Sequence, residues 1–128
     1  EIWNNIFIYD DTVPYAMMRS TTEIGSGWTA GGILNFGRNW INSRWSDNDP
    51  YHTVPGQLIG TSNFITGTTP PVDVNTLVPL AGSAVLDKGV AGPSAAAGHP
   101  VSYQVTTGYL AAPRAVNGTA SDLGAVER

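Results

Sequence analysis

Short apolar runs separated by turn residues recur along the chain and predict strands. The clearest runs lie at residues 2–9, 31–37, 57–66, 72–77 and 101–105, and most are flanked by glycine, proline or asparagine. Apolar and polar residues alternate with a period of two in the last run, as they do in a half-exposed strand. No long stretch spaces its apolar residues along one face of a helix. The pattern therefore predicts an all-β fold.

Composition supports this class and narrows the set of partners. The 128 residues, enough for one domain, include 15 Gly and 9 Pro, which favour turns over helices. The formal net charge is −4 and the few basic residues are scattered, so we expect no nucleic-acid partner. No apolar run approaches the roughly 20 residues of a spanning helix, so we expect no membrane span. The absence of cysteine excludes disulfides and thiolate chemistry.

Two related phrases, at residues 79–89 and 113–127, organise the last third of the chain. Each sets a short apolar run beside a carboxylate and a glycine, which is typical of a short buried strand with a sharp turn. The pair resembles the C-terminal end of secreted bacterial right-handed parallel β-helix proteins of the pectate-lyase-like type. In that family a "GSPAIDAG"-like phrase precedes an "R…G…DIGAYE"-like phrase. Ala84 and Val126 depart from it, standing where proline and an aromatic residue are usual.

The resemblance implies a fold and a location. Residues 1–79 would form β-helix coils with loop excursions, and residues 80–128 would be the C-terminal closing segment of the same domain. An antiparallel β-sandwich is the alternative fold. The family is secreted or surface-bound, so an extracellular or cell-surface location is expected. Because an open coil face exposes unpaired backbone, upstream coils, a companion chain or another copy should cover residues 2–8.

The closing segment contains charged residues and glycines that the resemblance identifies as a structural cap. These residues are Asp87, Gly89, Arg114, Asp122 and Gly124. Buried charge is costly unless it is paired. We therefore expect Arg114 to meet Asp87 or Asp122, or each carboxylate to accept backbone N–H groups. At both glycines we expect that a side chain would collide with its surroundings.

Asparagines next to apolar runs suggest a repeat. The Asn4-Asn5-Ile6 phrase is similar to one found in β-helix coils, where a bend asparagine stacks on its equivalents and bonds the turn backbone. A strand with two exposed asparagines is the alternative. Asn35 and Asn63 also lie beside apolar runs, at separations that coils with loop insertions would give.

The richest candidate for ligand binding is a cluster of aromatic and basic residues. Its members are Arg38, Trp40, Arg44, Trp45, Tyr51 and His52. Flat rings stack on sugars, and guanidinium groups bind the carboxylates of uronic acids, so the cluster suggests a glycan-binding groove. The alternative is that the tryptophans fill the core while the arginines remain solvated.

Metal and catalytic candidates are weaker. Asp47 and Asp49 alternate as oxygen ligands do in a calcium loop, but they lack the rest of the EF-hand pattern, and a backbone-bonded turn is the alternative. Apart from this calcium site, no cofactor is expected. His52 and His99 have no recognisable ligand spacing. No catalytic residue can be assigned, and the single lysine, Lys88, makes a poor lyase base.

Together these patterns predict part of a secreted or cell-surface β-helix protein that serves as a scaffold or a glycan-contacting surface. One alternative is a non-catalytic or partial chain of a polysaccharide lyase or glycoside hydrolase, whose catalytic groups assemble across coils. Another is a self-assembling surface subunit. The sequence favours no enzymatic activity for this chain alone.

Overall fold

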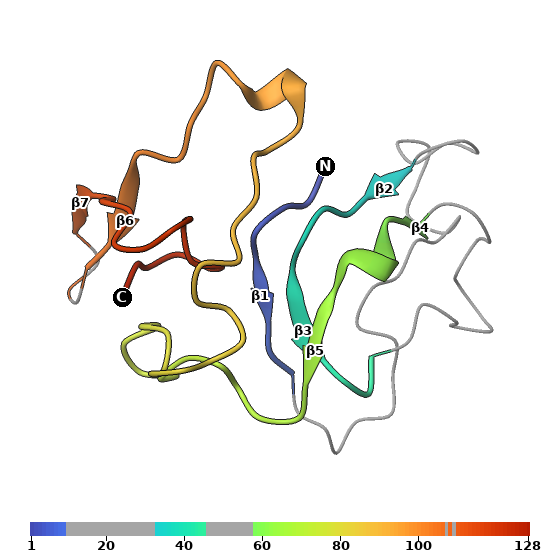
Figure 1. The fold of residues 1–128 in the computed structure, drawn as a ribbon, viewed down its shortest axis with the longest axis horizontal. Helices are drawn as coiled ribbons and strands as arrows, with labels where there is room; N and C mark the ends of the chain where they lie inside the picture. Colours follow the sequence, from blue (N-terminus) through green and yellow to red (C-terminus); the bar gives the residue numbers. More distant parts are fainter. Residues whose placement is uncertain (10–32, 46–57, 107, 109) are drawn as a thin grey trace.

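The computed structural model describes residues 1–9, 33–45, 58–106, 108 and 110–128. Over these residues the fold is all-β, with short strands, two turns of 3₁₀ helix and connecting coil (Figure 1). The strands are β1 (Ile6–Phe7), β2 (Leu34–Asn35), β3 (Trp40–Asn42), β4 (Leu58–Ile59), β5 (Ile65–Gly67), β6 (Tyr103–Val105) and β7 (Ala111–Pro113). The 3₁₀ turns are η1 (Thr61–Asn63) and η2 (Ser94–Ala96). No helix in this part of the chain is long and apolar enough to cross a membrane.

Two small parallel sheets are built from the same three stretches of chain, which are residues 2–7, 34–42 and 58–67. One has the order β1-β3-β5, and the other pairs β2 with β4. A parallel bridge between Ile2 and Phe36 adds the N-terminal residues beside β2. In the first sheet Ile6, Trp40 and Ile65 lie in one row across the strands. The second and third stretches therefore contribute a strand first to the β2-β4 sheet and then to the β1-β3-β5 sheet, and the first stretch contributes the Ile2 bridge and then β1 (Figure 1).

The two faces of the β1-β3-β5 sheet belong to different apolar clusters. Successive residues of a strand point to opposite faces, so Trp40 and Ile41 separate. Buried Ile41 packs with Phe36 and with half-buried residues that include Leu34 and Leu58, between the two sheets. Trp40 packs with residues of the closing segment. This second cluster consists of Trp40, Val85 and Leu123, with Ile6 and Ile65 against it.

Asparagine side chains join the first two stretches. Asn39 is completely buried, and its Oδ1 accepts the Asn5 backbone N–H at 2.8 Å and the Asn5 side-chain amide at 3.2 Å. Its own amide donates to the carbonyls of Ile2 and Gly37, both at 3.0 Å. The expected stacking of Asn5 is therefore present, and its partner is Asn39.

Asn35 and Asn63 do not share the place of Asn5, so the repeat suggested by these three residues is wrong. Asn35 pairs with Ile59 in the other sheet. Asn63 ends η1, where its amide donates to the Phe36 carbonyl at 3.1 Å. In the third stretch, the residue that lies beside Asn39 is Phe64, because Trp40 aligns with Ile65.

The second half of the chain contains little regular structure. The strand predicted at residues 101–105 is present as β6, which pairs with β7 in an antiparallel hairpin. An isolated antiparallel bridge joins Val72 to Pro79. Apart from η2, the rest of this half consists of turns and coil, and part of it passes beside β1 (Figure 1).

Candidate functional site: the closing segment and its charged network

The closing segment, residues 80–128, is tied to itself and to the start of the chain by backbone bonds. The Leu123 N–H donates to the Val85 carbonyl at 3.0 Å, so the two related phrases lie side by side. The Gly124 N–H donates to the Asn4 carbonyl at 2.8 Å. These contacts place Val85 and Leu123 over Trp40. The segment therefore covers one face of the β1-β3-β5 sheet.

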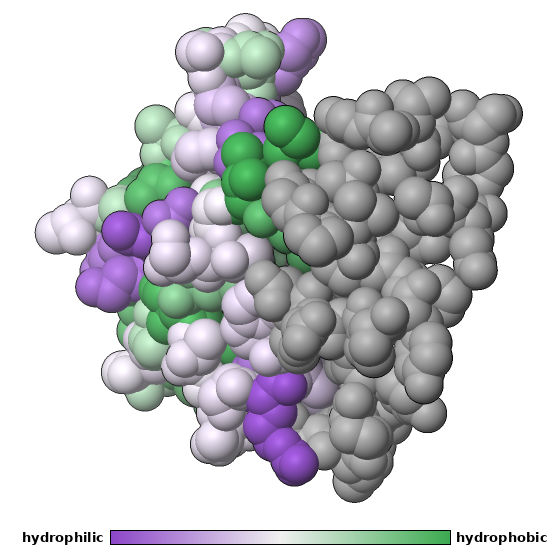
Figure 2. All heavy atoms as spheres, turned by 90° about the vertical axis from the view of Figure 1, so that its right-hand side faces the viewer, coloured by the Kyte–Doolittle hydropathy of each residue, from purple (hydrophilic) through white to green (hydrophobic). Residues whose placement is uncertain are grey.

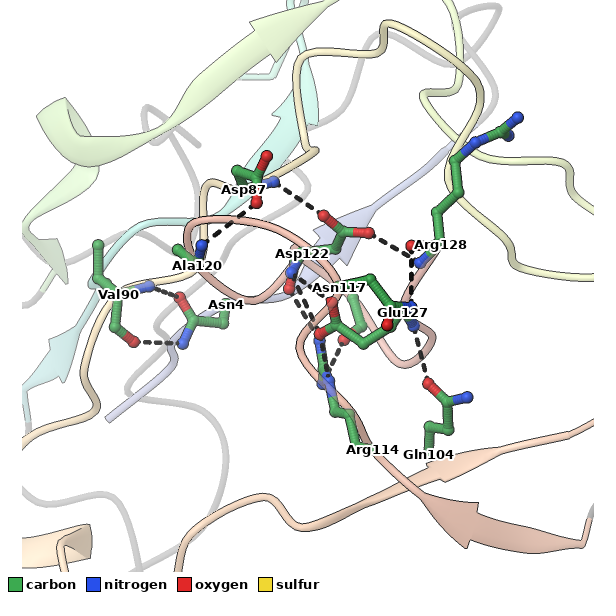
Figure 3. A network of polar contacts seen from close by, with 11 residues as sticks. Asn4, Asp87, Val90, Gln104, Arg114, Asn117, Ala120, Asp122, Glu127 and Arg128 are labelled. Carbon is green, nitrogen blue, oxygen red and sulfur yellow. Dashed lines mark hydrogen bonds and ion pairs between the residues drawn. The ribbon is translucent and has the colours of Figure 1, made fainter.

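Two carboxylates of this segment accept backbone N–H groups (Figure 3). Asp87 Oδ1 accepts from Thr119 at 2.7 Å and from Ala120 at 3.2 Å. Asp122 Oδ1 accepts the Asp87 N–H at 2.8 Å, and its Oδ2 accepts the Arg128 N–H at 3.0 Å. Each carboxylate thus fixes a turn whose backbone has no strand partner.

Arg114 forms its ion pair with Glu127, with 2.6 Å between Nε and Oε1. Its Nη1 donates to the Gly124 carbonyl at 3.1 Å and its Nη2 to the Asp122 carbonyl at 2.8 Å. The two paired side chains are only 9% and 2% exposed. The expected pairing of Arg114 with the carboxylate of Asp87 or Asp122 is therefore wrong, and the alternative, carboxylates that accept backbone N–H groups, is present (Figure 3).

Both cap glycines lie where a side chain would collide. A Cβ at Gly89 would come within 2.7 Å of the Ser121 carbonyl oxygen. Gly124 has a φ of +93°, a conformation that favours glycine, and a Cβ there would lie 2.9 Å from Ile6 Cδ1. The predicted collisions are confirmed at both positions.

Two polar anchors were not assigned from the sequence. Asn4, at φ +59°, forms paired bonds with the Val90 backbone: its amide donates at 2.7 Å and its Oδ1 accepts at 3.0 Å. Glu127 is buried, and its backbone N–H donates to Gln104 Oε1 at 2.9 Å. The sequence signal for Asn4 was the tolerance of asparagine for positive φ. The signal for Glu127 was its place as the acidic end of the second phrase.

The proposed glycan cluster does not come together as a groove among the described residues. Trp40 is 1% exposed and belongs to the core, which is the alternative interpretation, so it offers no ring face to a sugar. Trp45 is half-buried and packs edge-on against Phe64, with 5.0 Å between ring centroids. Arg38 and Arg44 are exposed. Tyr51 and His52 lie outside the described residues.

Candidates for other chemistry are equally dispersed. The proposed calcium ligands Asp47 and Asp49 lie outside the described residues, and elsewhere no group of three potential ligands gathers. A hollow of about 570 Å³ lies between residues 73–80, β6 and the end of the chain. Two acidic side chains line it: Glu127 is paired with Arg114, and Asp73 accepts the backbone N–H groups of Asn75 and Thr76. On the opposite side of the molecule, hydrophobic and hydrophilic residues are interspersed over the described surface (Figure 2).

No protein-family model, curated protein or solved structure matches this chain. The likeness of the closing segment to β-helix tails is therefore a prediction from the sequence.

Proposed function

We propose that the parallel stretches are rungs of a right-handed parallel β-helix and that the closing segment seals the side of the stack. Two observations support the proposal. The same stretches contribute, in the same order, to two parallel sheets. Asn39 stacks on Asn5 at the bend that precedes the first sheet, as polar ladders do between in-register strands.

On this basis we propose that the chain serves as a structural scaffold, secreted or exposed at a cell surface. The observation that carries the proposal is how the closing segment uses its chemistry. Asp87, Asp122 and the Arg114–Glu127 pair all bond the segment's own backbone or each other. These charges hold a chain in place, whereas catalytic groups are aimed at a substrate.

Nuclear magnetic resonance tests the architecture. Parallel rungs require cross-strand contacts from Ile6 to Trp40 and from Trp40 to Ile65, together with an Asn5–Asn39 amide contact. An antiparallel sandwich would instead give close Hα–Hα pairs between neighbouring strands. Antiparallel pairs among these residues would refute the β-helix.

Fractionation of the source cells tests the location. A secreted or surface scaffold should be recovered in the medium, or on intact cells in a form that added protease removes. Recovery only from the cell interior, protected from protease, would refute the surface proposal while leaving the fold untouched.

Glycan contact is the second candidate, and one contact favours it. Arg38 Nη1 lies 3.5 Å from the Lys88 carbonyl, so two exposed basic residues are neighbours on the surface. Neighbouring surface cations can bind the carboxylates of a uronic-acid polymer. Binding of polygalacturonate that weakens at least about tenfold in an Arg38→Ala, Lys88→Ala double variant would support it.

The same incubation separates binding from catalysis. Release of unsaturated sugar ends or of reducing ends would indicate a polysaccharide lyase or a glycoside hydrolase. Unchanged polymer, bound by the wild type and not by the double variant, would indicate a binding surface. Unchanged polymer that neither protein binds would refute glycan contact and leave the scaffold as the remaining proposal.

A further inference from the structure

The β6–β7 hairpin points its polar side chains inward. Gln104 and Ala112 form one cross-strand pair on the half-buried face. The Glu127 N–H donates to Gln104 Oε1 at 2.9 Å. Arg114, two residues beyond Ala112 and therefore on the same face, reaches the Glu127 carboxylate (Figure 3). The hairpin is thus attached to the rest of the molecule through polar groups.

Its opposite face is apolar and open to water. The cross-strand pairs there are Tyr103 with Pro113 and Val105 with Ala111, and all four residues are exposed. Val101 continues the row at 73% exposure, and Tyr103 is 65% exposed. We call these five residues the hairpin face. Antiparallel sheets usually turn the apolar face to the core and the polar face to water, and here the arrangement is reversed.

A two-stranded hairpin whose apolar face is exposed needs a binding partner over that face. Two strands alone are marginally stable in water. An exposed apolar row of this kind marks an interaction surface in soluble proteins. The aromatic ring of Tyr103 lies near the middle of the row, and such rings are common anchors of protein interfaces.

The distribution of charge indicates the occupant. The chain carries a net charge of −4, so two copies repel each other as a whole. Residues 89–113 contain no Asp, Glu, Lys or Arg. A second copy can therefore approach the hairpin face of the first without like charges meeting. An uncharged apolar row is complementary to itself, as a two-fold contact requires.

We propose that the hairpin face is the interface of a homodimer, in which the two hairpins pack apolar face to apolar face about a two-fold axis. Tyr103 and Val101 are the principal contact residues. The proposal does not depend on the β-helix or scaffold proposals, because it uses only the hairpin and its charges.

Sedimentation equilibrium over a range of concentrations tests the proposal on the full chain. The wild type should show a monomer–dimer equilibrium. A Val101→Ser, Tyr103→Ser double variant should dissociate with a Kd raised about tenfold or more, because exposed contact residues are removed without touching the polar attachment. The matched control is Ile33→Ser, which changes a residue of 55% exposure beside β2 and should leave the Kd unchanged.

A second measurement locates the contact. Because the chain has no cysteine, a single Tyr103→Cys variant carries one defined spin label. Labels at the two copies of this position should lie close together across the axis, whereas labels on an Ile33→Cys variant should not. A wild type that is monomeric at all concentrations would overturn the proposal. A dimer with the same Kd in the double variant, or with distant labels at residue 103, would overturn it as well.

Discussion

The parallel sheets and the closing segment satisfy their backbone groups in different ways. In the sheets, β3 exchanges ladder bonds with β1 on one side and β5 on the other. In the closing segment, strands are nearly absent outside the hairpin, and side chains take the place of neighbouring strands. Asp87 and Asp122 accept N–H groups, while Arg114 donates to two carbonyls.

This difference predicts how each region tolerates substitution. A ladder bond belongs to the backbone and survives most changes of side chain. In the closing segment one side chain serves several backbone groups, so its removal leaves all of them unpaired at once. Buried polar groups without partners each cost about 1–3 kcal/mol.

The largest effect is expected for Arg114→Ala. The buried Glu127 carboxylate would lose its cation, and two backbone carbonyls would lose their donors. We expect the free energy of unfolding to fall by about 3–5 kcal/mol, measured by urea denaturation. Lys88→Ala, which removes an exposed cation of the same segment, should change it by less than about 0.5 kcal/mol. Equal effects would show that the network is not structural.

Asn39→Leu probes a place where the parallel region also relies on a side chain. The substitution removes the side-chain acceptor of the Asn5 N–H. It also removes one donor from each of the Ile2 and Gly37 carbonyls. A loss of about 2–3 kcal/mol is expected in the same denaturation experiment. Asn63→Leu, which removes a single bond at an exposed turn, should cost about 1 kcal/mol or less. The reverse order would contradict the assigned register.

Gly124→Ala measures how closely the closing segment lies on the sheet. Positive φ and the nearby Ile6 side chain should together cost about 1–3 kcal/mol. Gly92→Ala is the control, because nothing lies within 4 Å of its added Cβ. That change should be neutral or slightly stabilising, by up to about 1 kcal/mol. Thermal unfolding followed by circular dichroism distinguishes the two, and similar melting temperatures would contradict the contact.

The smallest effect concerns an exposed turn. Backbone N–H groups of Asn75 and Thr76 bond the Asp73 carboxylate and hold its pKa below the ordinary value of 3.8. A carboxylate whose pKa is lowered on folding stabilises the folded state at pH values above its ordinary pKa. This stability is lost as the pH falls through the folded-state pKa. An NMR titration should show the lowered pKa, and Asp73→Asn should remove this part of the acid sensitivity. A pKa at or above 3.8 would refute it.

Part of the strand content could be predicted from the sequence, because the apolar runs and their flanking turn residues are local signals. The strand predicted at residues 72–77 is wrong, since only Val72 forms a bridge there, and β3 and β7 lie outside the predicted runs. The runs around Ile6, Leu34 and Tyr103 all contain strands. The collisions at Gly89 and Gly124 were also predictable, since each glycine lies two residues after a carboxylate, beside or within a short apolar run. These conclusions depend on a few neighbouring residues.

Register and pairing could not be predicted, because they depend on residues far apart. Asn39 was overlooked since nothing local distinguishes it from Asn35; only alignment with Asn5, 34 residues earlier, gives it a role. Trp40 was a candidate for sugar binding because an aromatic ring beside arginines suits both a surface and a core. The closing segment decides between them by covering that ring.

The paired bonds between Asn4 and Val90 span 86 positions of the chain. Contacts between such distant residues slow folding, because a long loop must close before they form. The first strand therefore cannot reach its final surroundings on a ribosome until residue 90 has emerged. Until then its apolar side chains are open to wrong partners.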